Sequence, residues 1–229
     1  MGSVELDIHQ QQLFIFSNII TYGNAATPEI TELIREEIET MWNEPAAGLK
    51  LHHSIFTIVF RIQASHDPAI SPIDIFQNLD PRNNYFRIEE FVHGNISFVD
   101  GLNCNSGYFK LENLYKGSTT AAHEYGHTLG LNHPKNLDIR GHGVPGIMYP
   151  RGTLVDPQFQ YDPLKPAGIT GGTMHPMYRK VKLEDIEALN LHRLDFHDNK
   201  GVLGEFTNVW HNDHANISPE DFFGGIINS

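Results

Sequence analysis

The amino-acid sequence predicts an α/β fold: a mixed, twisted sheet carries a central helix, and a smaller, irregular C-terminal lobe ends in a helix. Short runs rich in Ile, Phe and Val have the length of strands, and they alternate with stretches whose apolar residues recur at helical spacing. The order strand, helix, several strands, helix, long loop, helix favours helices packed on a sheet. Hydrophobic residues make up 40% and charged residues 19% of the 229 residues, which is typical of a folded globular chain.

The first strand and the first helix are expected near the N-terminus. Residues 13–20 form a short apolar run of strand length. A helix is expected over residues 27–42, because Thr27 is a suitable N-cap, Pro28 fits the first helical position and an apolar stripe follows at helical spacing. Further strands are expected at residues 54–62, 85–91, 95–99 and 108–111.

Two helices are expected after these strands. The first spans residues 118–130, where Ser118 can cap the N-terminus and Gly130 can end the helix in a left-handed conformation. The second spans residues 183–194, with an acidic first turn that complements the helix dipole. The long stretch between the two helices is rich in Gly and Pro, and it is therefore expected to be mostly loop.

Charge and composition exclude several classes of partner and site. The net charge of -12 repels phosphate backbones, so no nucleic-acid partner is expected. No apolar run approaches the ~18–20 residues that cross a bilayer, so no membrane span is expected. The single cysteine, Cys104, excludes a disulfide framework and a cysteine-based zinc site. Met1-Gly2-Ser3 looks like the remnant of an expression tag, which leaves room for a natural leader that has been removed.

The segment with the clearest chemistry is His123-Glu124-Tyr125-Gly126-His127-Thr128-Leu129-Gly130-Leu131-Asn132-His133. On a helix, residues four apart share a face, so His123 and His127 can point at one ion. A third residue on that face would lie too far along the axis, but Gly130 allows the chain to turn sharply and His133 to return. Three neutral His ligands leave one tetrahedral position open, which is typical of a catalytic rather than a structural zinc site.

Glu124 follows the first of the three histidines, and it is placed to approach water at the metal rather than the metal itself. A carboxylate there can take a proton from water and pass it to a leaving amine. Zinc lowers the pKa of water towards ~7 and polarises a carbonyl. Scattered surface histidines could match a short motif by chance, but this match falls on a segment that is independently predicted to be a helix followed by a turn.

The stretch 121–133 resembles the zinc-binding motif of the metzincin peptidases, and within them most resembles the matrix metalloproteinases and their bacterial relatives. Pro134, directly after the third His, is instead similar to the serralysins. Metzincins also carry a methionine in a tight turn below the metal, and Gly146-Ile147-Met148-Tyr149-Pro150 supplies one. Taken alone, Met148 would be a core methionine. With the motif, it is expected to support the site without binding the ion.

The resemblance implies one catalytic domain of zincin-like α+β fold over residues 1–229, with an upper lobe over about 4–132, a lower lobe over about 133–195 and an extension at 196–229 that has no counterpart. It implies a zinc-dependent endopeptidase with Zn²⁺ as cofactor and a protein or peptide substrate. The peptide would lie extended along an edge strand, for which residues 95–99 are the candidate. Substrate-binding residues are otherwise unassigned. Candidate wall residues of the substrate pocket, for which plain packing is an equal alternative, are Tyr161, Met174, Met177 and Tyr178.

Two alternatives to a general endopeptidase remain open. The first is a delivered toxin or effector peptidase that acts on one protein or on a cell-wall peptide. The second is a non-enzymatic zinc-binding module, against which the intact Glu124 argues. An acidic charge balance is common outside cells, so a secreted or extracellular location is expected, with delivery as an effector as the alternative. The sequence does not indicate the oligomeric state.

Overall fold

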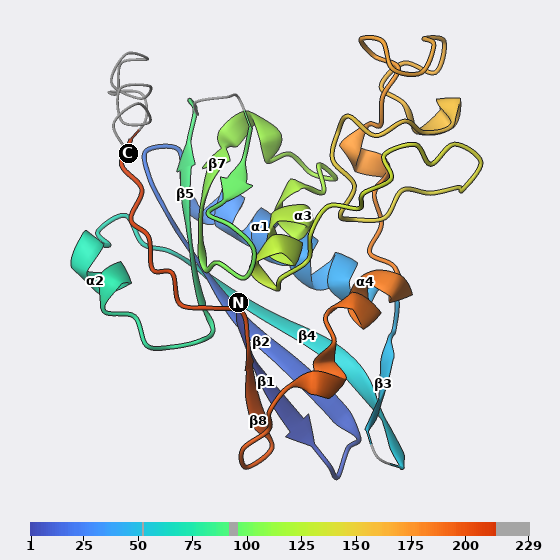
Figure 1. Ribbon diagram of the computed structural model, residues 1–229. Helices are drawn as coiled ribbons and strands as arrows, with labels where there is room; N and C mark the ends of the chain where they lie inside the picture. Colours follow the sequence, from blue (N-terminus) through green and yellow to red (C-terminus); the bar gives the residue numbers. More distant parts are fainter. Residues whose placement is uncertain (52, 92–95, 214–229) are drawn as a thin grey trace, which may run out of the picture.

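The computed structural model describes residues 1–51, 53–91 and 96–213, and Figure 1 shows how its elements are arranged. The strands are β1 (Gly2–Asp7), β2 (Gln12–Tyr22), β3 (Gly48–Leu51), β4 (Ser54–His66), β5 (Asn83–Glu89), β6 (Phe98–Val99), β7 (Ser106–Lys110) and β8 (Lys200–Leu203). The helices are α1 (Pro28–Asn43), α2 (Pro72–Phe76), α3 (Thr120–Thr128) and α4 (Leu183–Ala188), with 3₁₀ turns at Leu111–Asn113, Pro157–Phe159, Pro176–Tyr178 and Leu191–Arg193. In the described part of the chain, no helix combines the length and the apolar character needed to cross a membrane.

The eight described strands form one mixed sheet with the order β3-β4-β2-β5-β7-β6. β2 lies parallel to β4 and β5, and β5 lies parallel to β7. β3 and β6 are added antiparallel at the two ends, and β1 pairs antiparallel with the first half of β2. The predicted mixed sheet is therefore confirmed. The predicted edge at residues 95–99 corresponds to β6, although residue 95 lies outside the described residues.

Helix α1 starts where its sequence predicts. The Thr27 hydroxyl accepts a hydrogen bond from the Ile30 amide at 3.2 Å, and Pro28 occupies the first turn. The buried face of α1 ends in Trp42, whose indole Nε1 donates to the Ala122 carbonyl of α3 at 3.1 Å. α1 therefore packs directly on α3. The two helices and the sheet enclose the main apolar core.

Helix α3 is anchored to the sheet through Tyr125. This ring is fully buried and packs edge-on against Trp42 and Phe60, and its hydroxyl lies 2.8 Å from the Ser17 hydroxyl on β2. A buried tyrosine with its hydroxyl paired fixes both the depth and the rotation of the helix that carries it. The face of α3 opposite the sheet is thereby left to form the site described below.

The start of α3 differs from the prediction. The helix begins at Thr120, and its N-cap is Thr119 in a left-handed conformation with φ 59° rather than Ser118. The orphan amides are capped from α1: one Glu37 carboxylate oxygen accepts from the amide of Thr119 at 3.1 Å and the other from the amide of Ala122 at 3.2 Å. A carboxylate at a helix N-terminus also complements the helix dipole. The sequence predicted a cap from the neighbouring Ser118, whereas in the folded chain the capping carboxylate comes from Glu37 of α1.

The segment between α3 and α4 projects from one end of the sheet as an irregular lobe (Figure 1), in agreement with the predicted loop. The last predicted helix is shorter than expected. α4 ends at Ala188, and Asn190 then takes a left-handed conformation with φ 52° before a 3₁₀ turn. Asn is one of the few residues that adopt this conformation readily, and it breaks the helical run. The predicted lower lobe, over about residues 133–195, therefore ends in α4 and this turn, and β8 follows it in the extension.

The C-terminal extension returns to the sheet. β8 pairs antiparallel with β1, from Gly2 opposite Leu203 to Glu5 opposite Lys200. The first residues of the chain are thus part of the fold, since the Met1 side chain is fully buried and Gly2 opens β1.

After β8, the described part of the extension runs alongside the start of β7. The Asn105 Oδ1 atom accepts hydrogen bonds from the backbone amides of Thr207 at 3.0 Å and Asn208 at 2.8 Å. Further on, the Trp210 ring stacks on Tyr22 with centroids 4.9 Å apart. This part of the extension, for which the sequence suggested no role, therefore covers the end of the sheet near β5 and β7.

Candidate metal centre and pocket

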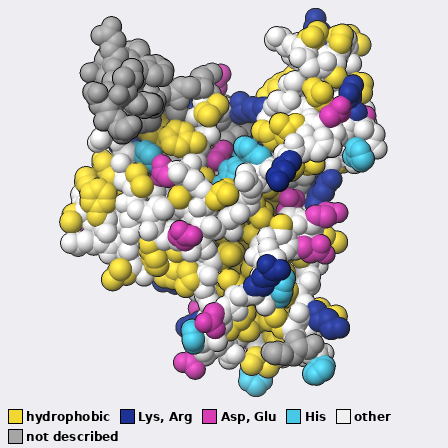
Figure 2. Space-filling model, viewed as in Figure 1, with side chains coloured by type: hydrophobic (Ala, Val, Ile, Leu, Met, Phe, Trp, Pro, Cys, Tyr) yellow, Lys and Arg dark blue, Asp and Glu magenta, His cyan; other side chains and the backbone are white. Residues whose placement is uncertain are grey.

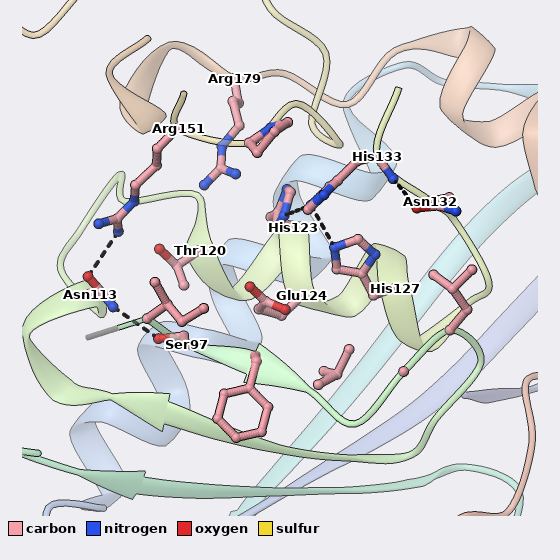
Figure 3. A pocket seen from close by; sticks show the side chains of 16 residues that line it. Ser97, Asn113, Thr120, His123, Glu124, His127, Asn132, His133, Arg151 and Arg179 are labelled. Atoms are coloured by element: carbon pink, nitrogen blue, oxygen red, sulfur yellow. Dashed lines mark hydrogen bonds between the residues drawn. The ribbon is translucent and has the colours of Figure 1, made fainter. Parts of the chain in front are cut away.

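Three imidazoles converge on one point above α3. The Nε2 atoms of His123 and His127 each lie 3.1 Å from the Nε2 atom of His133. One ring nitrogen from each residue lies within 4.8 Å of the other two, so a single ion between them could contact all three. Figure 3 shows His123 and His127 on the helix and His133 returning from the loop after it. Gly130, with φ 96°, turns the chain between them.

The other ring nitrogens of the two helical histidines are held by backbone carbonyls. The Ile147 carbonyl lies 2.7 Å from Nδ1 of His123, and the Leu131 carbonyl lies 2.7 Å from Nδ1 of His127. A carbonyl can only accept, so each Nδ1 carries the hydrogen and each Nε2 keeps a free lone pair toward the common point. This second contact is the one that orients metal-binding histidines in proteins.

Burial keeps these imidazoles neutral. Desolvation is the first cause that lowers the pKa of His123 well below its usual range and the pKa of His127 to about 4. It also lowers the pKa of His133, which is the most exposed of the three. A metal ligand must present an unprotonated nitrogen, and all three do so near neutral pH. Three neutral nitrogen donors with free lone pairs fit zinc.

Glu124 lies on an adjacent face of the same helix and lines the same pocket (Figure 3). Its side chain is almost entirely removed from solvent, and this burial raises its pKa to about 8. The positive charge of Arg179, a backbone hydrogen bond from Val99 and the charge of Arg151 act in the opposite direction. The carboxyl group is thus near the three imidazoles but separate from their cluster, as its position after His123 predicts.

The pocket is an open cavity of about 430 Å³. Figure 2 shows histidine side chains in a hollow of the surface, with basic side chains beside them. β6 forms one side through Phe98 and Val99, and the opposite side carries Arg151 and Arg179. The predicted edge strand therefore borders the three imidazoles, and its role in holding a peptide stays a prediction.

The predicted wall residues do not line this pocket. Met174 is fully buried in a separate small cluster with Ile139 and Val155, and about half of the Met177 side chain is exposed. The packing alternative is therefore the correct one for Met174. The pocket instead contains polar and charged residues that the sequence reasoning missed, namely Asn113, Thr120, Arg151 and Arg179. Thr120 stands one helical turn before Glu124, a signal that was available in the sequence.

Met148 is buried, and its sulfur lies directly over Gly126 in the middle of α3. The preceding residue, Ile147, supplies the carbonyl that orients His123. The absence of a side chain at Gly126 allows the methionine to approach the helix this closely. Support of the histidines by Met148 stays a prediction, but its position beside the helix that carries two of them agrees with that role.

Gly126→Ala is expected to destabilise the protein by about 1–3 kcal/mol, because a methyl group there overlaps the Met148 sulfur and lies 3.2 Å from Cζ2 of Trp42. In an uncrowded helix interior the same change would stabilise by roughly 0.5–1 kcal/mol. Urea unfolding measures the difference. Gly152→Ala is the matched control with little expected effect, since no atom lies within 4 Å of the added methyl group. A stabilised Gly126→Ala variant would contradict the close packing of Met148 on α3.

Comparisons with known proteins find similar solved structures but no family. No protein-family model matches the chain, and no curated protein matches it significantly. The chain is similar to the crystal structure of archaemetzincin from Methanopyrus kandleri, with a TM-score of 0.38 and 10% identity over 77% of this chain and 95% of that chain. It is also similar to myroilysin, with a TM-score of 0.31 and 16% identity over 63% of this chain and 60% of that chain. The chemistry of the site follows from its own side chains.

Proposed function

We propose that the protein is a zinc-dependent endopeptidase that hydrolyses peptide bonds in proteins. The observation that carries this proposal is the convergence of three neutral imidazoles with a carboxyl group beside them in one open pocket. A structural zinc site is closed by four protein ligands, whereas three His ligands facing a cavity leave room for a substrate.

His123, His127 and His133 would hold the zinc ion. When bound there, zinc supplies Lewis acidity, which polarises a carbonyl and makes water easier to deprotonate. Glu124 takes the proton from the attacking water and passes it to the leaving amine. Because burial raises the pKa of Glu124 to about 8, the carboxylate form that accepts this proton becomes more populated as the pH rises towards that value.

β6 is proposed to seat the substrate. It pairs with β7 on one side and ends the sheet, so its other side offers backbone groups to an extended peptide. Val99 of β6 lies next to Glu124, to whose carboxyl group its backbone hydrogen-bonds. A peptide added along this edge would therefore pass close to the carboxyl group and the three imidazoles.

The test is cleavage of a broad library of peptides with blocked ends by zinc-loaded protein. Endopeptidase activity predicts cuts at internal bonds, loss of cutting with a zinc chelator and recovery on addition of about one equivalent of zinc. Blocked ends exclude peptidases that need a free terminus. A zinc-loaded protein that cuts no member of the library, although it binds peptides, would support the non-enzymatic zinc-binding module instead.

A further inference from the structure

One wall of the pocket carries a buried guanidinium that no described carboxylate pairs with directly. Only 3% of Arg179 is exposed. Its Nε atom donates to the Thr119 hydroxyl at 2.8 Å, and an Nη atom donates to the Tyr149 carbonyl at 3.3 Å. Both acceptors are uncharged. The charges of Glu124 and Glu37 act on Arg179 only from a distance. A cation removed from water costs free energy unless an anion compensates it, so the guanidinium lacks a hydrogen-bonded anion and can bind one from a ligand.

A second guanidinium is held at the same wall. Arg151 follows the turn of Met148, and its Nη2 atom donates to Asn113 Oδ1 at 2.9 Å. The Asn113 amide in turn donates to the Ser97 hydroxyl, next to β6, at 3.2 Å. Figure 3 shows this chain of contacts and places both guanidinium groups toward the pocket. Arg151 is more exposed than Arg179, and within the described residues it too has no ion-pair partner.

An unpaired hydroxyl lies between this wall and Glu124. Thr120 is 4% exposed and lines the pocket, and its Oγ1 atom is buried without a hydrogen-bond partner among the described residues. Buried hydroxyls in folded proteins almost always have a partner, so an unpaired one that lines a pocket is able to bind a group that enters the pocket. Thr120 and Glu124 are four residues apart on α3, and their side chains therefore lie on the same side of the helix.

We propose that Arg179, Arg151 and the Thr120 hydroxyl form a binding site for a carboxylate on the substrate residue that directly follows the bond that is cut. Guanidinium groups present N–H donors in a fork that matches the two oxygens of a carboxylate, and the hydroxyl adds one further donor. The site rests on the proposed peptidase function for its substrate, but the carboxylate-binding groups are defined by the structure alone.

The position of this site assigns the carboxylate to the leaving side of the scissile bond. Thr120 lies one turn from Glu124, which gives its proton to the leaving amine, whereas His123 and His127 occupy the neighbouring face of α3. A residue whose carboxylate contacts Arg179 would thus follow the scissile bond. The carboxylate could belong to the side chain of Asp or Glu, or it could be the C-terminal carboxylate of a peptide.

The experiment uses octapeptides with an acetylated N-terminus that are identical except for Glu, Gln or Lys directly after the cleaved bond, each prepared with a free or an amidated C-terminus. Hydrogen bonds to a charged group contribute roughly 1.5–3 kcal/mol, so kcat/KM for Glu over Gln is expected to rise about 10–100-fold. A preference for Glu over Gln in amidated peptides indicates that the site binds the carboxylate of a side chain. Cleavage only at the last peptide bond, and only in peptides with a free C-terminus, indicates that the site binds the terminal carboxylate.

Variants then test the three groups. Arg179→Gln should abolish the preference for Glu over Gln, and Arg151→Gln and Thr120→Val should each reduce it. Arg179→Gln also disturbs contacts to Thr119 and Tyr149, so Thr120→Val and Arg151→Gln carry the test if that variant does not fold. Lys135→Gln is the matched control: its side chain is outside the pocket, and it should leave the preference unchanged.

Binding separates failure of this site from failure of the peptidase function. The same peptides are titrated calorimetrically into zinc-loaded Glu124→Ala protein, which requires no turnover. Tighter binding of a carboxylate-bearing peptide than of its neutral counterpart, weakened by Arg151→Gln, supports the site even if the wild-type protein cleaves nothing. Equal affinity and equal kcat/KM for acidic and neutral peptides would overturn it, and Arg179 would then serve only as a distant counter-charge for Glu124.

Discussion

Replacement of His127 by Ala is expected to reduce the zinc content of the purified protein from about one ion per chain to a small fraction of that. Loss of a residue that only orients a ligand typically weakens metal binding about 10–100-fold, so loss of a ligand itself should exceed that range. The three Nε2 atoms lie close together with their lone pairs free, and two imidazoles alone leave the ion held by half of a tetrahedral set. Elemental analysis after gel filtration measures the change.

The same variant should lose the effect of zinc on stability. A ligand that binds only the folded state at 100 times its Kd stabilises by ~2.7 kcal/mol, so the wild-type Tm should rise with added zinc and the His127→Ala Tm should stay flat. His142→Ala is the matched control, since His142 is exposed and lies outside the histidine cluster. The control should keep its zinc, and undiminished zinc in His127→Ala would contradict the ligand assignment.

The parts of the site that lie close together in the sequence could be predicted from it. Helical spacing alone places His123 and His127 on one face, and a glycine three residues further on provides the turn that returns His133. The structure brings these side chains together as the spacing predicts. Similar local arguments located α1 from its cap and its apolar stripe, and the mixed sheet from the order of apolar runs.

The parts that depend on distant contacts could not be predicted in this way. The cap of α3 comes from Glu37, which is more than eighty residues before the helix. The last strand, β8, pairs with the first, but Lys200–Leu203 contains a glycine and only two large apolar residues, so its sequence resembles a loop. Strand formation of this kind depends on the neighbouring strand more than on the residues that take part.

The pocket wall that carries Arg179 could not be predicted from the sequence either. Arg179 is flanked by Tyr178 and Lys180, and such a stretch is typical of an exposed loop. In the folded chain Arg179 is buried and donates a hydrogen bond to Thr119. Neither its burial nor this contact can be read from the sequence. The sequence reasoning instead selected large side chains in the same segment, because apolar residues are the usual lining of a pocket.

Replacement of Glu124 by Ala is expected to separate chemistry from metal binding. Glu124 contributes no atom to the imidazole cluster, so the variant should keep about one zinc per chain and bind peptides with near wild-type affinity. Its turnover should fall by at least ~100-fold, because general acid–base groups typically contribute ~10²–10⁴-fold in rate. Glu124→Gln, which keeps the shape of the side chain but cannot take a proton, should show a loss of the same order.

The comparison requires zinc content, peptide affinity and kcat on one preparation of each protein, since a partly metal-free sample would imitate a catalytic defect. Glu36→Ala is the matched control: this glutamate is exposed on α1, and its loss should leave all three quantities unchanged. A structural role for Glu124 predicts a change in Tm with little change in kcat, whereas proton transfer predicts a fall in kcat at unchanged zinc content. Near wild-type kcat in zinc-loaded Glu124→Ala protein would refute the proposed role of Glu124 while leaving the three histidines as the metal site.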